Sequence, residues 1–204
     1  MLAFSSLLGN VEGQNIYRIW YDKPASYWEE ALPVGNGRIA AMVFGNPQLE
    51  QIQLNEETVS AGSPYQNYNE EAKTALPEMR RLIFEGKYEE AQNMAATKIL
   101  SQVGNEMPYQ TVGRLNIRYQ DHKKVNNYYR DLDISNAVAV TRYEVDGVEF
   151  TEETFASFTD QLVIRHIKAS KPGTINCELF FNTPMRDPKR SIYGKKGLRL
   201  EGIT

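Results

Sequence analysis

The chain has 204 residues, which is long enough to bury a hydrophobic core without disulfide staples. Its 23 Lys and Arg residues nearly balance its 26 Asp and Glu residues, and this argues against a nucleic-acid-binding protein because such proteins normally carry a basic excess. Its one cysteine excludes an intrachain disulfide and a multi-cysteine zinc site, and its two histidines are far apart, so we expect neither a metal nor a cofactor. No apolar run reaches the roughly 18 residues of a membrane-spanning helix, so no membrane span is expected.

Residues 1–14 begin with the apolar segment MLAFSSLL, which is similar to the apolar part of a secretory signal peptide. A charged segment before it and a small-residue cleavage site after it are absent from the sequence. Two interpretations therefore stay open for residues 1–14: an irregular N-terminal arm, or a signal-peptide remnant. The second would imply a periplasmic or secreted protein.

Short strands separated by turns are predicted in the next part of the chain. Residues 15–21 are aromatic and β-branched, residues 38–44 form an apolar run that fits a buried strand, and residues 50–55 alternate apolar with polar side chains. Glycine, proline and asparagine lie between these segments, as is typical of turns.

Residues 70–101 change to a helical spacing of apolar residues. Asn69 can cap the first helix, and Gly86 separates two apolar stripes. Pro77 is predicted to open a new helix, because proline is tolerated in the first turn and not in the interior. The pattern predicts a two-helix insertion over residues 70–101 with its apolar side against the sheet.

From residue 109 the period-two alternation returns, and Asp146 with Gly147 gives a strong hairpin signal. The predicted strands are 115–119, 137–145, 148–155, 162–167, 174–181 and 197–201. Many short strands at regular spacing predict a mainly β fold, an antiparallel β-sandwich of the supersandwich type. Because the last strand begins close to Thr204, we expect the sandwich domain, residues 15–204, to be truncated at its C-terminal end.

Few residues are candidates for a catalytic or metal-binding role. Glu152 and Glu153 are interpreted as part of a solvated acidic face, since neighbours on a strand point to opposite faces and cannot flank one bond. His166 is interpreted as a core or interface histidine, His122 as solvent-facing, and Cys177 as a small buried hydrophobe. The sequence contains no nucleophile-elbow, phosphate-loop or zinc-protease motif.

Several segments carry a family resemblance. They are residues 20–38 (WYDKPASYWEEALPVGNGR), 41–45 (AMVFG), 52–58 (IQLNEET), 76–91 (LPEMRRLIFEGKYEEA), 109–113 (YQTVG), 129–133 (YRDLD) and 155–157 (FAS). In these segments and in their order, the chain resembles the N-terminal domain of family 95 glycoside hydrolases, the α-L-fucosidases, over residues 16–185.

The resemblance implies a β-sandwich domain that precedes an (α/α)6 helical barrel, and it implies that the barrel holds the catalytic residues. We therefore expect no catalytic residue in this chain. The implied function is that of a non-catalytic N-terminal domain, which supports a helical-barrel partner domain in the hydrolysis of fucosyl glycans.

Asn55 and Glu56 are the candidates for a substrate-binding site, because they follow a predicted strand and loops at strand ends carry function. The alternative for them is a turn with a local side-chain bond. Aromatic residues such as Trp20 and Trp28 can either stack on sugars or pack in the sandwich. Two other functions therefore stay open: a stand-alone module that binds fucosylated glycans, and an interaction module that dimerises through an exposed apolar patch.

Overall fold

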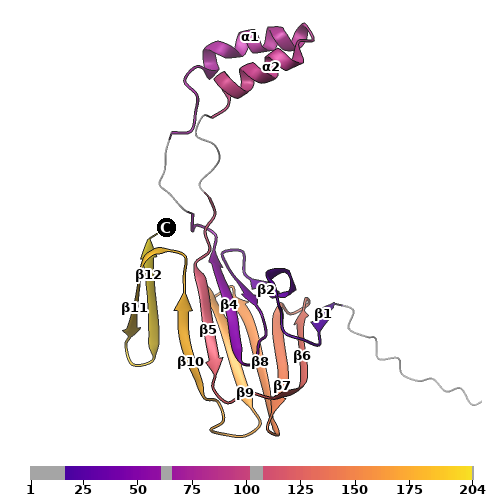
Figure 1. The fold of residues 1–204 in the computed structure, drawn as a ribbon, viewed down its shortest axis with the longest axis vertical. Coiled ribbons are helices and arrows are strands. Elements are labelled where there is room, and N and C mark those ends of the chain that lie inside the picture. Colours follow the sequence, from indigo (N-terminus) through magenta and orange to yellow (C-terminus); the bar gives the residue numbers. More distant parts are fainter. Residues whose placement is uncertain (1–16, 61–65, 102–107, 204) are drawn as a thin grey trace, which may run out of the picture. The chain divides into compact units, whose positions relative to one another are not determined.

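A computed structural model describes residues 17–60, 66–101 and 108–203, so residues 1–14 lie outside the described part. The chain divides into two compact units. The sandwich unit contains the residues up to Val59 and those from Thr111 to Ile203, and the helical unit contains Ser60–Gln110. Figure 1 shows the strands of the first unit and the helices of the second.

The elements follow the predicted order of strands, two helices and further strands. They are β1 (Arg18–Tyr21), η1 (Trp28–Glu30), β2 (Leu32–Gly35), β3 (Ile39–Val43), β4 (Leu49–Glu56), α1 (Ala72–Phe84), α2 (Tyr88–Met94), η2 (Ala95–Ile99), β5 (Gly113–Tyr119), β6 (Val125–Asp133), β7 (Val138–Val145), β8 (Val148–Ser157), β9 (Leu162–Ala169), β10 (Cys177–Asn182), β11 (Arg186–Tyr193) and β12 (Gly197–Ile203).

Two five-stranded antiparallel sheets confirm the predicted sandwich. Sheet 1 has the order β1-β6-β7-β8-β9, and sheet 2 has the order β10-β5-β4-β3-β2. The hairpin β11–β12 forms a two-stranded sheet of its own, and Arg190 in it donates a 3.1 Å hydrogen bond from Nε to the carbonyl of Phe181 at the end of β10. Strands β7, β8 and β9 form a meander within sheet 1, while the next strand, β10, joins the other sheet.

The main core lies between the two sheets, and alternate residues of the facing strands supply it. Its buried members are Leu32, Val34, Ala41, Val43, Ile52, Ile117, Tyr119, Leu132 and Ala139. Each fully buried aliphatic side chain contributes about 1.5–3 kcal/mol to folding. A second buried cluster on the β7–β8 hairpin contains Tyr143, Val145, Val148 and Phe150. The turn between these strands has Asp146 and Gly147 at positive φ, as their hairpin signal predicts.

Three strands, β2, β6 and β11, have no counterpart in the predictions. Strand β2 is only four residues long and contains Pro33 and Gly35, which are uncommon inside strands. In β6 the register shifts between Asn126 and Tyr129, and Asn127 has a positive φ of 50°, so the period-two pattern is interrupted. Strand β11 is polar and exposed along its whole length, so it lacks the apolar alternation that identifies a half-buried strand.

The helical unit confirms the predicted pair of helices. Asn69 accepts a 3.0 Å hydrogen bond from the backbone N–H of Glu71 at the start of α1, and Gly86 takes a positive φ of 75° between α1 and α2. The prediction that Pro77 opens a new helix is wrong, because α1 runs through it. Proline at the sixth helical position removes one hydrogen bond, to the carbonyl of Lys73, and the rest of the ladder continues.

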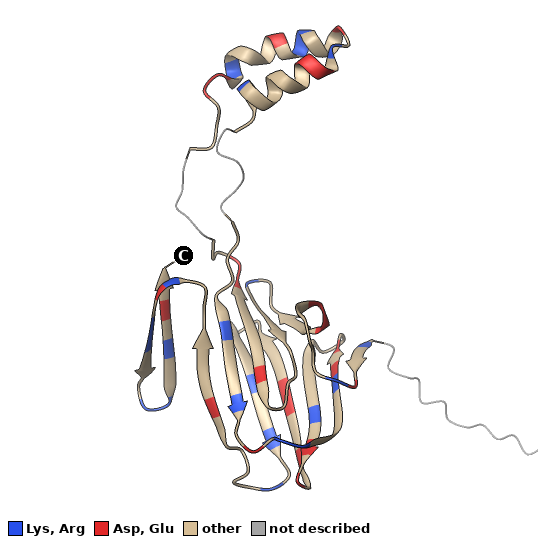
Figure 2. Ribbon diagram, viewed as in Figure 1, with Lys and Arg blue, Asp and Glu red and all other residues tan. Residues whose placement is uncertain are grey.

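Charged residues of both signs are interspersed on the strands and on the helices (Figure 2). No helix among the described residues is long and apolar enough to cross a membrane.

Candidate functional site

Asn55 and Glu56 are the last two residues of β4, and they pair with Ala40 and Ile39 of β3. They therefore lie in the sheet and not in a loop after it. Both line one end of a cleft of about 580 Å³ in the sandwich unit.

The carboxylate of Glu56 is held in a local turn. The Thr58 hydroxyl donates to it at 2.6 Å, the Thr58 backbone N–H at 2.9 Å, and Arg38 Nε at 3.1 Å. These donors, the Thr58 hydroxyl first, lower the pKa of Glu56 below its ordinary value. Glu56 is thus a stabilised anion with local partners, which agrees with the alternative of a turn with a side-chain bond and does not suit a general acid.

The cleft itself is mainly apolar. Sheet 2 supplies most of its walls and β9 of sheet 1 supplies the rest; the apolar side chains are Ile39, Ala40, Ile52, Leu54, Val112, Leu115, Ile117, Leu162, Val163, Ile167, Leu179 and Phe181. Among the described residues that line it, Glu56 is the one carboxylate. Glycoside hydrolysis by the usual mechanisms needs two carboxyl groups that face the same bond, so this cleft does not supply that arrangement.

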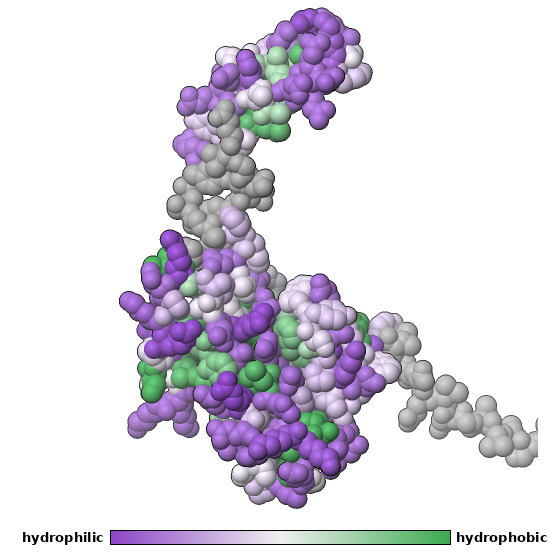
Figure 3. Space-filling model, viewed as in Figure 1, coloured by the Kyte–Doolittle hydropathy of each residue, from purple (hydrophilic) through white to green (hydrophobic). Residues whose placement is uncertain are grey.

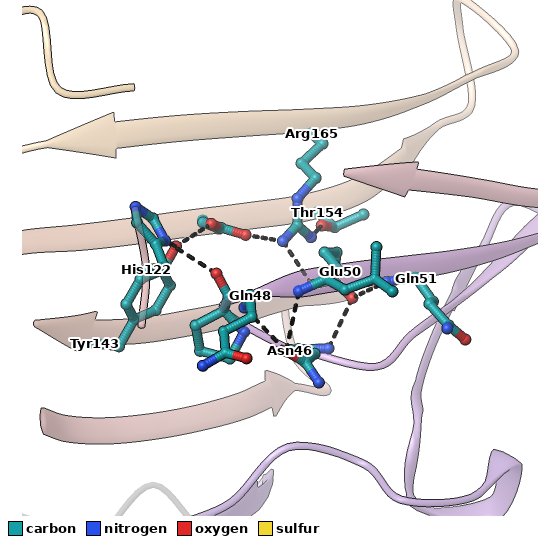
Figure 4. A network of polar contacts seen from close by, with 12 residues as sticks. Asn46, Gln48, Glu50, Gln51, His122, Tyr143, Thr154 and Arg165 are labelled. Atoms are coloured by element: carbon teal, nitrogen blue, oxygen red, sulfur yellow. Dashed lines mark hydrogen bonds and ion pairs between the residues drawn. The ribbon is translucent and has the colours of Figure 1, made fainter. Parts of the chain in front are cut away.

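A buried network of polar side chains lies beside the cleft and connects the two sheets (Figure 4). Arg165 of β9 donates from Nη2 to Glu50 of β4 at 2.7 Å and to Glu152 of β8, and from Nη1 to the Thr154 hydroxyl at 2.8 Å. Tyr143 donates its hydroxyl to Glu152 at 2.6 Å.

Glu50 also accepts two backbone N–H bonds, from Gly45 and Gln51, both at 2.9 Å. The side chains of Glu50 and Glu152 are 1% and 2% exposed. Two carboxylates that share one guanidinium and have no access to solvent cannot meet a substrate. The network is a structural clamp, in which each buried charge has a partner.

The network corrects two predictions. Glu152 is not part of a solvated face, because its side chain turns inward to Arg165 while Glu153 turns outward to Lys168. His122 is not solvent-facing: it is 4% exposed and stacks on Tyr119 with ring centroids 4.3 Å apart. The carbonyl of Pro47 lies 2.9 Å from His122 Nδ1, and burial lowers the pKa of the imidazole.

The core interpretation of His166 is wrong, because its side chain is 55% exposed and contacts Glu153, while the interface interpretation stays a prediction. The side chains of β9 that face the core are those of Val163, Arg165 and Ile167, of the opposite parity. Cys177 packs half-buried against the core, and burial raises the pKa of its thiol.

The segments that carry the family resemblance contact one another. Arg130, in segment 129–133, is fully buried and donates to the carbonyls of Lys23 at 2.8 Å and Glu30 at 2.7 Å, both in segment 20–38. Its guanidinium lies 4.0 Å from the ring centroid of Tyr21. Segment 129–133 thus supplies the hydrogen-bond donor, and segment 20–38 supplies the backbone acceptors.

Two further segments join this contact. Asn36 donates from Nδ2 to the carbonyl of Ser157, at the end of segment 155–157, at 2.7 Å. Gly45, at the end of segment 41–45, has a positive φ of 72°, and a Cβ there would lie 2.8 Å from Arg130 Cδ. These motif residues therefore contribute to the packing of the sandwich. The role of Arg130 could not be predicted from the sequence, because its partners are backbone carbonyls far away in the chain.

The described residues contain no group of three His, Cys, Asp or Glu side chains placed to hold a metal ion.

Comparison with known proteins gives a consistent set of relatives. The family model described as glycosyl hydrolase family 65, N-terminal domain, matches residues 19–204. The chain is 37% identical over 181 residues to alpha-L-fucosidase 2 of Arabidopsis thaliana, and this alignment covers 86% of the chain and 21% of the relative. It is 26% identical over 162 residues to probable alpha-fucosidase A of Aspergillus niger, covering 74% of the chain and 20% of the relative.

The chain spans about a fifth of the length of these curated relatives. The sandwich, the positions of the resembling segments and the matched region agree with one another. The chain therefore belongs to the family of glycosyl hydrolase family 65 N-terminal domains, and its predicted relation to the N-terminal domains of α-L-fucosidase-like glycoside hydrolases is confirmed.

Proposed function

We propose that this chain is the non-catalytic N-terminal domain of an α-L-fucosidase of family 95, and that it supports a helical-barrel catalytic domain which acts on fucosyl glycans. The observation that carries the proposal is that these three carboxylates are either buried or held by neighbouring side chains. Glu50 and Glu152 are buried on one guanidinium, and Glu56 is held by Thr58 and Arg38. Inverting hydrolysis needs two carboxyl groups about 6.5–9.5 Å apart on opposite sides of the sugar.

The names of the relatives support the choice of fucose, since three matching proteins are called alpha-fucosidases. Their greater length supports a separate catalytic part. A periplasmic or secreted location belongs to this proposal, because fucosyl glycans are mostly found outside the cytoplasm.

The test is an assay on an aryl α-L-fucoside with two samples: residues 1–204 alone, and the full-length polypeptide that contains them. We expect turnover only in the second sample. Turnover by residues 1–204 alone would contradict the proposal, and so would an inactive but folded full-length protein. The Glu50→Gln variant is the control in the full-length protein, because a carboxylate that acts only as a structural clamp changes thermal stability more than the pH profile of kcat.

A second candidate function is glycan binding by the sandwich itself. Trp20, Tyr27 and Trp28 are 61%, 57% and 53% exposed, and Trp20 stacks on Tyr129 with ring centroids 6.3 Å apart. Exposed aromatic rings of this kind can bind the apolar face of a sugar. An NMR titration of residues 1–204 with a fucosylated oligosaccharide tests this: shifts of the Trp20 and Trp28 indole signals that disappear in Trp20→Ala would support binding, and unchanged spectra would exclude it.

A further inference from the structure

The two sheets of the sandwich are offset from each other. Strand β2 of sheet 2 packs against β6, β7 and β8, and β3 packs against β8 and β9. Neighbouring strands lie about 4.8 Å apart, so each step along sheet 2 moves the contact toward the edge of sheet 1. Strand β4 then lies opposite β9, to which Glu50 and Arg165 join it. Ile117 and Tyr119 of β5 are still buried in the core, and the next strand of sheet 2, β10, lies beyond that edge.

Apolar side chains on this overhang are uncovered. Leu179 on β10 is 47% exposed although it has the same parity as Cys177 and Phe181, which face the inside of the sandwich. Leu179 and Phe181 line the cleft of about 580 Å³. Figure 3 shows hydrophobic surface in the region of β10 and the β11–β12 hairpin.

Strand β9 offers a second feature at the same place. Its one neighbour among the described strands is β8, so its other edge has backbone N–H and C=O groups without a strand partner in sheet 1. Natural proteins cover or block such edges. Arg165 in the middle of β9 also has a buried Nε for which the described residues provide no acceptor. The edge of β9, the exposed apolar side chain of Leu179 and the Nε of Arg165 therefore lie around one cleft.

We propose that a β-strand from another part of the full-length polypeptide, outside residues 1–204, pairs with the free edge of β9 and inserts its alternate apolar side chains into the cleft. The strand continues sheet 1 opposite β10 and the first half of β5, and it covers Leu115, Leu179 and Phe181. This inference rests on the proposed function, which places this chain in a longer enzyme. Since the relatives are about five times as long as the aligned region, ample polypeptide exists to provide the strand.

The first test is amide hydrogen exchange of β9 (Leu162–Ala169) in residues 1–204 and in the full-length protein. We expect exchange to slow by at least about tenfold in the full-length protein, at every second residue, because only alternate N–H groups point to one edge of a strand. Unchanged exchange of β9 would overturn the proposal. So would a gene that ends at residue 204.

The second test uses Leu179→Asn with Ile134→Asn as the matched control, because Ile134 is similarly exposed (54%) and lies in the turn between β6 and β7. We expect Leu179→Asn to lower the melting temperature by several degrees in the full-length protein and by less than about two degrees in residues 1–204. The control variant should shift both proteins equally and slightly. Equal shifts for Leu179→Asn in both proteins would overturn the proposal.

A concentration-dependent dimer of residues 1–204 that Leu179→Asn abolishes, with β9 unprotected in the full-length protein, would assign the cleft to a second copy and would also overturn the proposal. None of these readouts measures fucoside turnover. A full-length protein that protects β9 but does not cleave the fucoside would therefore contradict the proposed function alone.

Discussion

The two sides of the sandwich use the same strand chemistry but differ in what covers them. On the covered side, where β2 and β3 face β6–β8, Leu32 and Val43 are 2% exposed. On the side of the open cleft, Leu179 follows the same alternation in β10 and is 47% exposed. The difference shows that alternation selects the face of a side chain, whereas the relative position of the two sheets decides its burial.

Arg165 stands at the boundary between these sides, and its loss is expected to have the largest effect. Arg165→Leu leaves Glu50 and Glu152 as buried carboxylates without their cation, and we expect a loss of about 3–5 kcal/mol in the free energy of unfolding, measured by urea denaturation. Replacing Glu152 by Gln in the same protein should restore part of the loss. A loss below about 1 kcal/mol would mean that the network does not hold the sheets together.

The contrast between the two sides can be measured directly with one type of substitution. Leu32→Ala removes a side chain from the covered core and should cost about 2–5 kcal/mol. Leu179→Ala in residues 1–204 should cost less than about 1 kcal/mol, because half of the side chain is already in water. Equal losses from the two variants in denaturant titrations would show that the cleft is closed in solution.

The pH dependence of stability is expected to depend on His122, which is buried among Tyr119, Tyr143 and Phe150. Burial lowers its folded pKa below the unfolded value of about 6.5, so the unfolded chain binds more protons between these two values. Stability should therefore fall as the pH decreases from about 7 to about 5. In His122→Phe this contribution is absent, so the difference in unfolding free energy between the wild type and the variant should change across that range. A constant difference would contradict a buried neutral imidazole.

The smallest effect is expected at the rim of the open cleft. Glu56→Gln removes a carboxylate whose folded pKa is lowered by the Thr58 hydroxyl and Arg38. Its contribution is present above the unfolded pKa of about 4.3 and is lost as the pH falls through the lower folded value. We expect a small loss of stability at pH 7 that disappears in acid, checked by thermal melts at both pH values. An equal loss in acid would show that Glu56 acts through packing and not through its charge.

Local patterns account for the elements that were predicted correctly. The alternation in β4, β5, β7, β8 and β9 and the turn at Asp146 and Gly147 are properties of a few neighbouring residues. The same patterns were insufficient in β6, where a bulge at Asn127 interrupts the period, and in β11, where every residue is exposed. Pro77 was misjudged because one missing hydrogen bond did not end α1.

The sequence by itself determined the fold class, the helical insertion and the family, because alternation, turn residues and the resembling segments each depend on residues that are close together in the sequence. Only the tertiary structure decided which titratable side chains are buried. Glu152 and His122 look like surface residues in their own segments, and their partners Arg165 and Phe150 reach them through strand pairing and loop packing. The open cleft was equally hidden in the sequence, because it results from the offset between two sheets and not from the side chains of any one strand.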